Sequence, residues 1–221
     1  MKRGLISMLV VALTLSMTVV ADDTLDAAFL KAEAGRASLA TAATESRAQN
    51  PEGAQKAFES SQSAFREAVA LCSSFNPDRF RDRDDALRYA VTMELASEND
   101  LAARGFARAY QLSPDNADAG ISAARNWRMS GDVGLDKALA VLITMNQSGD
   151  SEDTSSAPLH SELGRVYLEQ GLPDLALEAY RKALEKDATY VDAIIGEGVL
   201  AMRNGDLRGA FTRLGALTEM T

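Results

Sequence analysis

Hydrophobic positions along the chain recur at steps of three and four residues, which is the period of an amphipathic helix. The segment 52–72 is a clear example, with Ala54, Ala57, Phe58 and Phe65 on one stripe. Short breaks containing Pro, Gly or Asn separate such segments, and no strand candidate exceeds a few residues. The pattern therefore predicts an all-α fold of about ten helices in five hairpins. The expected helices cover residues 24–48, 52–72, 84–96, 99–112, 117–129, 135–145, 158–169, 174–186, 190–203 and 206–219.

Signals for helix ends sharpen these boundaries. Asp174 and Asp206 stand where the side chain of an N-cap residue accepts a hydrogen bond from the first helical turn. Gly171 and Gly205 stand just past the ends of the preceding helices, where a left-handed residue is favoured. The polar, acidic stretch 146–156 predicts an exposed loop.

The chain repeats itself with a period of 34 residues after Ala157. Repeats of this length are single supersecondary units that stack to bury their apolar faces. Small residues at Gly164 and Ala176 predict the point where the two helices of a hairpin cross, with Tyr180 filling the space beside them. The pairs of positions related by this shift include Gly164 and Gly198, Gly171 and Gly205, Ala176 and Ala210, and Tyr180 and Leu214.

The best-defined unit, residues 157–190, resembles a tetratricopeptide repeat. It carries Leu163-Gly164, Tyr167, Gly171, Ala176, Tyr180 and Ala183 at that family's spacing, although Ala188 replaces the usual closing proline. The following unit departs further, with Glu197 in place of a leucine and Ala201 in place of an aromatic residue. The resemblance implies an α-solenoid of antiparallel helix hairpins. It also implies that the first helix of each hairpin lines a concave groove that binds peptides or partner helices.

Four segments follow from these observations. Residues 1–21 are expected to be a signal peptide, and residues 22–82 a divergent helical hairpin region. Residues 83–156 are expected to hold repeat-like units with an insertion and the acidic loop. Residues 157–221 are expected to hold two repeats, of which the second is divergent.

The amino terminus has the three-part layout of a secretory signal peptide. Lys2 and Arg3 precede an apolar run over 4–20, and small residues at 19 and 21 predict cleavage after Ala21. An uncleaved anchor is the alternative, but the run is marginal against the roughly 20 residues that span a bilayer. Asp22 stands where a bacterial lipoprotein needs cysteine. We therefore expect a periplasmic protein without stable membrane insertion after cleavage.

Charge and residue counts restrict the function. The 221 residues carry 23 Lys and Arg against 32 Asp and Glu, a net charge of −9, which disfavours nucleic-acid binding. Losing Lys2 and Arg3 with the signal peptide would leave a net −11. One cysteine and one histidine exclude an internal disulfide and the usual zinc sites. With no nucleotide-binding or hydrolase motif either, we expect a protein that is not an enzyme and needs no cofactor.

Arginines are the notable feature of the groove that the family resemblance implies. Their planar guanidinium groups bind carboxylates at two points, so the groove is expected to grip an acidic or C-terminal peptide segment. The alternative is that they are surface arginines paired with local acids such as Glu162, Glu169 or Asp118. The expected partner-binding residues are Arg125, Arg128, Arg165, Leu168, Met202 and Arg203.

The carboxyl-terminal helix is a second candidate for a contact surface. Phe211, Leu214 and Leu217 share an apolar stripe with few charges to cover it. Repeat arrays generally need a polar capping helix, so this stripe predicts an edge for docking or for a homo-oligomer. The alternative is that the stripe packs fully against residues 191–204.

The family resemblance, taken with the signal-peptide layout, implies a non-enzymatic adaptor or assembly factor of the bacterial cell envelope that binds a protein or peptide partner. Two other classes stay open. One is a thiol-dependent enzyme or redox protein that uses Cys72, and the other is a small-molecule carrier with a pocket between helices. No motif in the sequence supports either of them.

Overall fold

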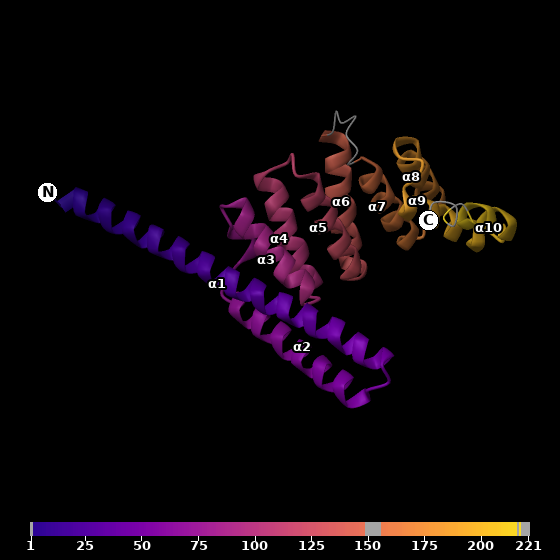
Figure 1. Ribbon diagram of the computed structural model, residues 1–221. Helices are drawn as coiled ribbons and strands as arrows, with labels where there is room; N and C mark the ends of the chain where they lie inside the picture. Colours follow the sequence, from indigo (N-terminus) through magenta and orange to yellow (C-terminus); the bar gives the residue numbers. More distant parts are fainter. Residues whose placement is uncertain (1, 149–155, 216, 218–221) are drawn as a thin grey trace. The chain divides into compact units, whose positions relative to one another are not determined.

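The computed structural model describes residues 2–148, 156–215 and 217, with side chains from residue 23 onward except those of Ser148 and Ser156. The chain divides into two compact units, Met1–Leu112 and Ser113–Thr221. Each unit is a set of antiparallel helices in chain order (Figure 1).

The first unit begins with a long hairpin of α1 (Lys2–Arg47) and α2 (Pro51–Cys72). The 3₁₀ turn η1 (Pro77–Arg79), α3 (Arg83–Leu95) and α4 (Asn99–Leu112) follow. The turn into α2 is built locally, because the Asn50 side chain accepts a hydrogen bond from the Gly53 amide and Pro51 takes the first helical position. Asp82 caps α3 in the same way, through the amides of Asp84 and Asp85.

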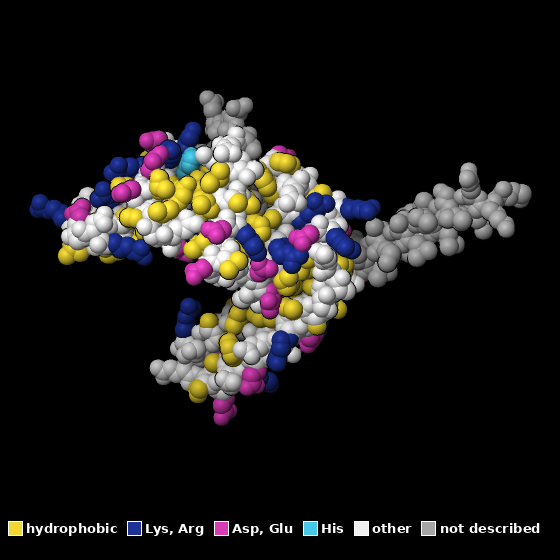
Figure 2. Space-filling model, turned by 180° about the vertical axis from the view of Figure 1, so that it is seen from behind, with side chains coloured by type: hydrophobic (Ala, Val, Ile, Leu, Met, Phe, Trp, Pro, Cys, Tyr) yellow, Lys and Arg dark blue, Asp and Glu magenta, His cyan; other side chains and the backbone are white. Residues whose placement is uncertain are grey.

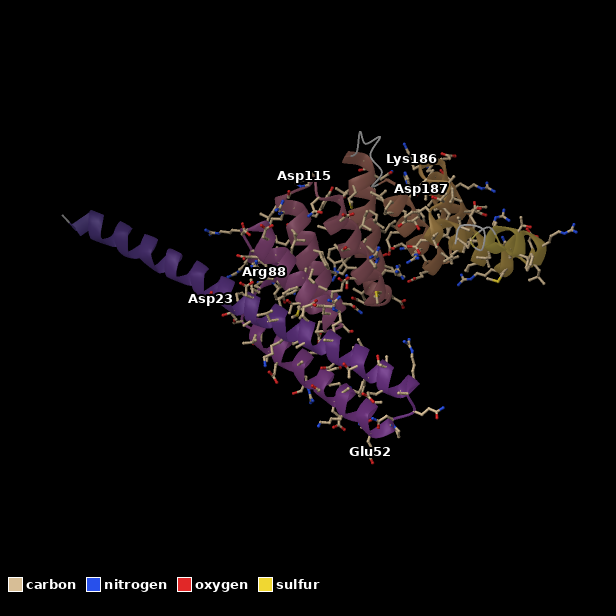
Figure 3. The ribbon with its side chains drawn as sticks, viewed as in Figure 1. Asp23, Glu52, Arg88, Asp115, Lys186 and Asp187 are labelled. Carbon is tan, nitrogen blue, oxygen red and sulfur yellow. The ribbon has the colours of Figure 1, made fainter. Side chains whose placement is uncertain are left out.

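Two close helix contacts hold the first unit together. A Cβ atom added to Gly35 would lie 2.7 Å from the Phe65 ring, and one added to Gly105 would lie 2.9 Å from the Cβ of Ala90. Glycine at these positions lets α1 approach α2 and lets α4 approach α3. Arg88 of α3 also pairs with Asp26 of α1 at 2.9 Å, and Figure 3 shows Arg88 near the labelled Asp23 on α1.

The second unit holds six helices, each packed against the next. The alternate helices α5, α7 and α9 also contact one another in sequence, which is the arrangement of stacked hairpins. Their bounds are α5 (Ala117–Met129), α6 (Asp132–Ser148), α7 (Ser156–Glu169), α8 (Pro173–Lys186), α9 (Val191–Arg203) and α10 (Leu207–Gly215).

Three of the four predicted helix-end signals of this unit are confirmed. Gly171 and Gly205 have φ of +76° and +77°, and the Asp206 carboxylate accepts a hydrogen bond of 2.8 Å from the Gly209 amide. The prediction for Asp174 is wrong. The N-cap of α8 is Leu172, which makes no side-chain capping bond, and Pro173 takes the first helical position. Asp174 lies inside the first turn, where its charge still favours the helix dipole.

The 34-residue repeat appears as the same contact in two hairpins. A Cβ atom on Gly164 of α7 would lie 2.6 Å from the ring of Tyr180 on α8. A Cβ atom on Gly198 of α9 would lie 2.7 Å from Leu214 on α10. Tyr180 is 1% exposed and belongs to a core cluster with Ala176 and other apolar side chains. The predicted crossing and its aromatic filler are both confirmed.

The predicted all-α, α-solenoid class is confirmed: the described residues form ten α-helices and no strand. Most helix bounds lie within a few residues of expectation, but α1 begins at Lys2 rather than near residue 24, and α6 is longer than expected at both ends. Residues 149–155, the larger part of the expected acidic loop, lie outside the described residues, as do the side chains of the expected signal peptide. No helix in the described part of the chain has a stretch long and apolar enough to span a membrane.

Candidate partner-binding face

Two arginines from successive first helices lie near the start of α9. Arg165 of α7 pairs with Asp192 of α9, with 2.8 Å between Nη2 and Oδ1. Tyr190 stands at the N-cap position of α9 and makes no side-chain capping bond. Burial and the nearby Asp192 raise the pKa of its phenol, and the positive charges of Arg125 and Arg165 oppose that rise. Both guanidinium groups therefore lie within electrostatic range of the same phenol. We call these four residues, Arg125, Arg165, Tyr190 and Asp192, the arginine face.

The arginine face carries one more positive charge than it can neutralise. Arg125 is half-buried and makes no ion pair with any residue that the structure describes. Asp192 is engaged by Arg165. In a chain of net charge −9, a half-buried cation without a carboxylate partner is a site where an external carboxylate gains a charge-assisted hydrogen bond.

Arg128, also expected on this surface, is a structural residue of the interior. Its Nε and Nη1 atoms lie 2.7 Å from Glu162 Oε1 and Glu169 Oε1, which joins α5 to α7. The side chains of Arg128 and Glu162 are only 14% and 4% exposed. Burial disfavours the charge of Arg128, but the two glutamates outweigh it and raise the guanidinium pKa. This matches the alternative in which groove arginines pair with local acids.

The other three expected residues do not form one cluster: Leu168 lies on α7, and Met202 and Arg203 lie at the carboxyl end of α9. Leu168 is half-buried on α7 and packs against the core that contains Tyr180. Met202 is 46% exposed near the end of α9, and Arg203 beside it is exposed. Met202 and Arg203 are therefore accessible to a partner, whereas Leu168 is mainly a packing residue.

The apolar stripe of the carboxyl-terminal helix also contains both exposed and packed side chains. Phe211 is 81% exposed on α10, while Leu214 covers Gly198 of α9 and Leu217 is half-buried. Leu207 adds a second exposed apolar side chain, at 71%. Phe211 and Leu207 are thus free for docking or self-association, which stays a prediction, and Leu214 holds the last hairpin together.

Three residues of this part of the molecule, Tyr190, Asp192 and Glu197, could not be identified from the sequence. Their roles depend on contacts between helices. Tyr190 and Asp192 carry only the local signals of a helix start. Glu197, the apparent departure from the repeat pattern, is 12% exposed and lies 3.0 Å from Arg213 of α10 and 3.7 Å from Arg181 of α8. An acid at an expected leucine position was the one signal that pointed to such a buried pair.

Comparison with known proteins identifies one repeat in the second unit. The family model for the tetratricopeptide repeat matches residues 157–190. Residues 157–190 form a tetratricopeptide repeat. No curated protein matches the sequence of the chain. Repeats of this kind generally bind protein partners and are typically non-catalytic.

Solved structures show the same fold. The thermophilic TPR protein TTC0263 of Thermus thermophilus matches with a TM-score of 0.53 and 18% identity, over 84% of this chain and 91% of that chain. The MamA RS-1 ArsTM double mutant matches with a TM-score of 0.51 and 17% identity, over 86% and 96%. The crystal structure of MamA aligns at 0.49 and 19% identity, over 77% and 92%. The first two likenesses place the chain among folds of the tetratricopeptide type.

Cys72, the basis of the thiol-enzyme alternative, is poorly suited to nucleophilic chemistry. It is 2% exposed at the end of α2, and burial raises the pKa of its thiol to about 11. A nucleophilic cysteine needs a lowered pKa and access to solvent. His160, the chain's only histidine, lies in the second unit and loses basicity through burial and the nearby Lys182 and Lys186, so its pKa is lowered.

We expect Cys72 in the native protein to react with a disulfide reagent at pH 8 at least a hundredfold more slowly than in the unfolded protein. With a pKa of about 11, only about one thiol in a thousand is ionised at that pH, against roughly a quarter for an ordinary cysteine. Absorbance of the released thiolate measures both rates, and the same sample in 6 M guanidinium chloride is the control. Equal rates in the two states would contradict the buried, protonated thiol.

A pocket in the second unit bears on the small-molecule alternative. It has a volume of about 110 Å³ and lies between α6, α7 and α8, and its lining includes His160, Leu163, Tyr167 and Lys182. Figure 2 shows hydrophobic side chains on one side of the histidine and charged side chains on the other. Pockets for small ligands usually measure roughly 300–1,000 Å³. This pocket has room for about one apolar side chain, which does not favour a carrier.

Proposed function

We propose that the protein is a non-enzymatic adaptor or assembly factor of the bacterial cell envelope that binds an acidic or C-terminal peptide segment at the arginine face. The observation that carries the proposal is the positive charge of Arg125 and Arg165 beside Tyr190, where Asp192 pairs with Arg165. Glu162, the other acid that acts on this phenol, is held by Arg128. A peptide carboxylate would accept hydrogen bonds from these guanidinium groups. The exposed Met202 and Arg203 lie further along the same helix and would extend the contact.

The helical scaffold supports a binding role. Arg125 and Arg165 stand on helices fixed by core packing and by the buried Arg128–Glu162 pair, so their positions are set before a partner arrives. A preorganised site loses less conformational entropy on binding than a flexible loop does. Electrostatic steering would add to the encounter rate for an acidic segment.

The cell-envelope part of the proposal rests on the amino-terminal sequence. Cleavage after Ala21 would give a chain that starts at Asp22. Leu25, Ala28 and Ala32 are fully buried. The folded core therefore begins within a few residues of the expected cleavage site. A periplasmic location then follows from the signal peptide.

The decisive experiment is a crosslinking pull-down with residues 22–221 from the envelope fraction of the host. We expect the double variant Arg125→Glu/Arg165→Glu to lose the captured partner by about tenfold or more, since breaking charge pairs at an interface costs roughly 2–5 kcal/mol. The matched control is Lys186→Glu/Arg208→Glu, which makes the same charge change at two exposed positions. Circular dichroism of each variant establishes that it is folded.

Three outcomes decide the proposal. A protein captured by the wild type and the control, and lost with Arg125→Glu/Arg165→Glu, supports it. Equal capture by both double variants moves the contact away from the arginine face, and the exposed Phe211 edge is then the next surface to test. A partner found only in the cytoplasm would overturn the envelope assignment.

A further inference from the structure

One of the two arginines, Arg165, already forms an ion pair with an acid of the protein itself, Asp192. The Arg165–Asp192 pair has a short distance of 2.8 Å, but its side chains are 31% and 39% exposed. Solvent screens an ion pair at this degree of exposure, so it contributes little stability and exchanges readily. The buried Arg128–Glu162 pair, which joins α5 to α7, lacks this freedom, because its side chains are 14% and 4% exposed.

The ion pair itself identifies Asp192 as the acid that can exchange, because its Oδ1 atom lies 2.8 Å from Nη2 of Arg165. The groups that act on the phenol of Tyr190 are Asp192, Arg125, Arg165 and Glu162. Glu162 is held by Arg128 at 2.7 Å and is not available. Asp192 is thus the half-exposed carboxylate that shares Arg165 with any external one.

We propose that Asp192 is an internal competitor that keeps Arg165 occupied until the carboxylate of a partner peptide displaces it. On binding, the ligand carboxylate takes the place of the Asp192 carboxylate on Arg165 and Arg125 adds the second contact, while Asp192 turns to solvent. A ligand must therefore bind Arg165 more strongly than Asp192 does. This competition favours ligands with more than one acidic group. This inference rests on the proposed function, because it assumes that the arginine face binds a carboxylate.

Asp192 can be changed without large structural cost. It lies in the first turn of α9, where a negative charge favours the helix dipole, but it is not the capping residue. Asparagine keeps its shape and removes its charge. Asp118 is a matched control, since it is an exposed acid in the first turn of α5.

The test measures binding of a fluorescein-labelled hexaglutamate with a free C-terminal carboxylate, by fluorescence anisotropy. We expect Asp192→Asn to tighten the Kd by roughly two- to fivefold, the range by which an exposed ion pair can compete. Asp118→Asn should change it less than twofold, because it loses the same charge without freeing Arg165. Arg165→Gln in the Asp192→Asn background should abolish the gain.

The outcomes separate this inference from the function on which it rests. If Asp192→Asn binds the probe no better than Asp118→Asn, while Arg125→Glu/Arg165→Glu still loses it, Asp192 is not a competitor and the arginine face stands. A wild-type chain that fails to bind the probe, together with an Asp192→Asn variant that also fails, overturns both.

Discussion

Replacing Tyr180 with alanine is expected to lower the free energy of unfolding of the second unit by about 3–5 kcal/mol. The ring is 1% exposed and is enclosed by Gly164 of α7 and Gly196 of α9, so its removal leaves a cavity that the two helices cannot fill by small shifts. Trp127, the chain's one tryptophan, lies in α5 of the same unit. Its fluorescence during urea unfolding gives the measurement.

Phe211→Ala is the matched control, because this aromatic side chain is 81% exposed on α10. It should cost less than about 0.5 kcal/mol, as surface substitutions usually do. A similar loss for both variants would mean that the enclosed position of Tyr180 is not what stabilises the unit.

The effect of Gly196→Ala on stability tests the same contact more strictly, because it should change sign when Tyr180 is removed. In the wild type, Gly196→Ala places a Cβ atom within 2.5 Å of Tyr180 Cε1, and such overpacking costs about 1–3 kcal/mol. In the Tyr180→Ala background the clash is gone, and alanine should stabilise α9 by up to about 1 kcal/mol through its helix propensity. Stabilisation by Gly196→Ala in the wild type would contradict the contact.

These residues also show what the sequence can predict. Gly164 and Tyr180 could be assigned in advance because a hairpin crossing needs one small and one large residue at a fixed spacing, and the pattern recurs as Gly198 and Leu214. The second side of the Tyr180 enclosure, Gly196, could not be assigned. It depends on how α9 stacks on α8, which the periodicity within one hairpin does not determine.

The candidate site was predicted less completely, for a physical reason. Sequence gives the helix and the face on which an arginine lies, but not which acid of the next hairpin comes within reach. Arg128 meets Glu162, one 34-residue period later, and becomes part of the interior. Arg125, one turn earlier on α5, makes no ion pair with a described acid and stays available. Tyr190 and Asp192 join the arginine face only because α7 and α9 lie side by side.

Arg128→Met is expected to destabilise the second unit by about 3–5 kcal/mol, because it leaves the Glu162 carboxylate buried without a partner. Lys182→Met is the matched control. The Lys182–Glu178 pair has the same 2.7 Å distance as the Arg128–Glu162 pair, but its side chains are 51% and 61% exposed. Its loss should cost less than about 1 kcal/mol. Circular dichroism during urea unfolding measures both variants, and equal losses would show that burial does not decide the effect.

The double variant Arg128→Met/Glu162→Met distinguishes a role of Arg128 in stability from a role in peptide binding. Replacing both members of a buried pair with apolar residues of similar volume is often neutral or stabilising, and Glu169, at 43% exposed, can turn to solvent. We therefore expect the double variant to recover most of the stability that Arg128→Met loses. Since Arg125 and Arg165 stay in place, it should also bind an acidic peptide as the wild type does. A stable double variant that no longer binds would place Arg128 in the binding site itself, and the ligand would then have to reach between α5 and α7.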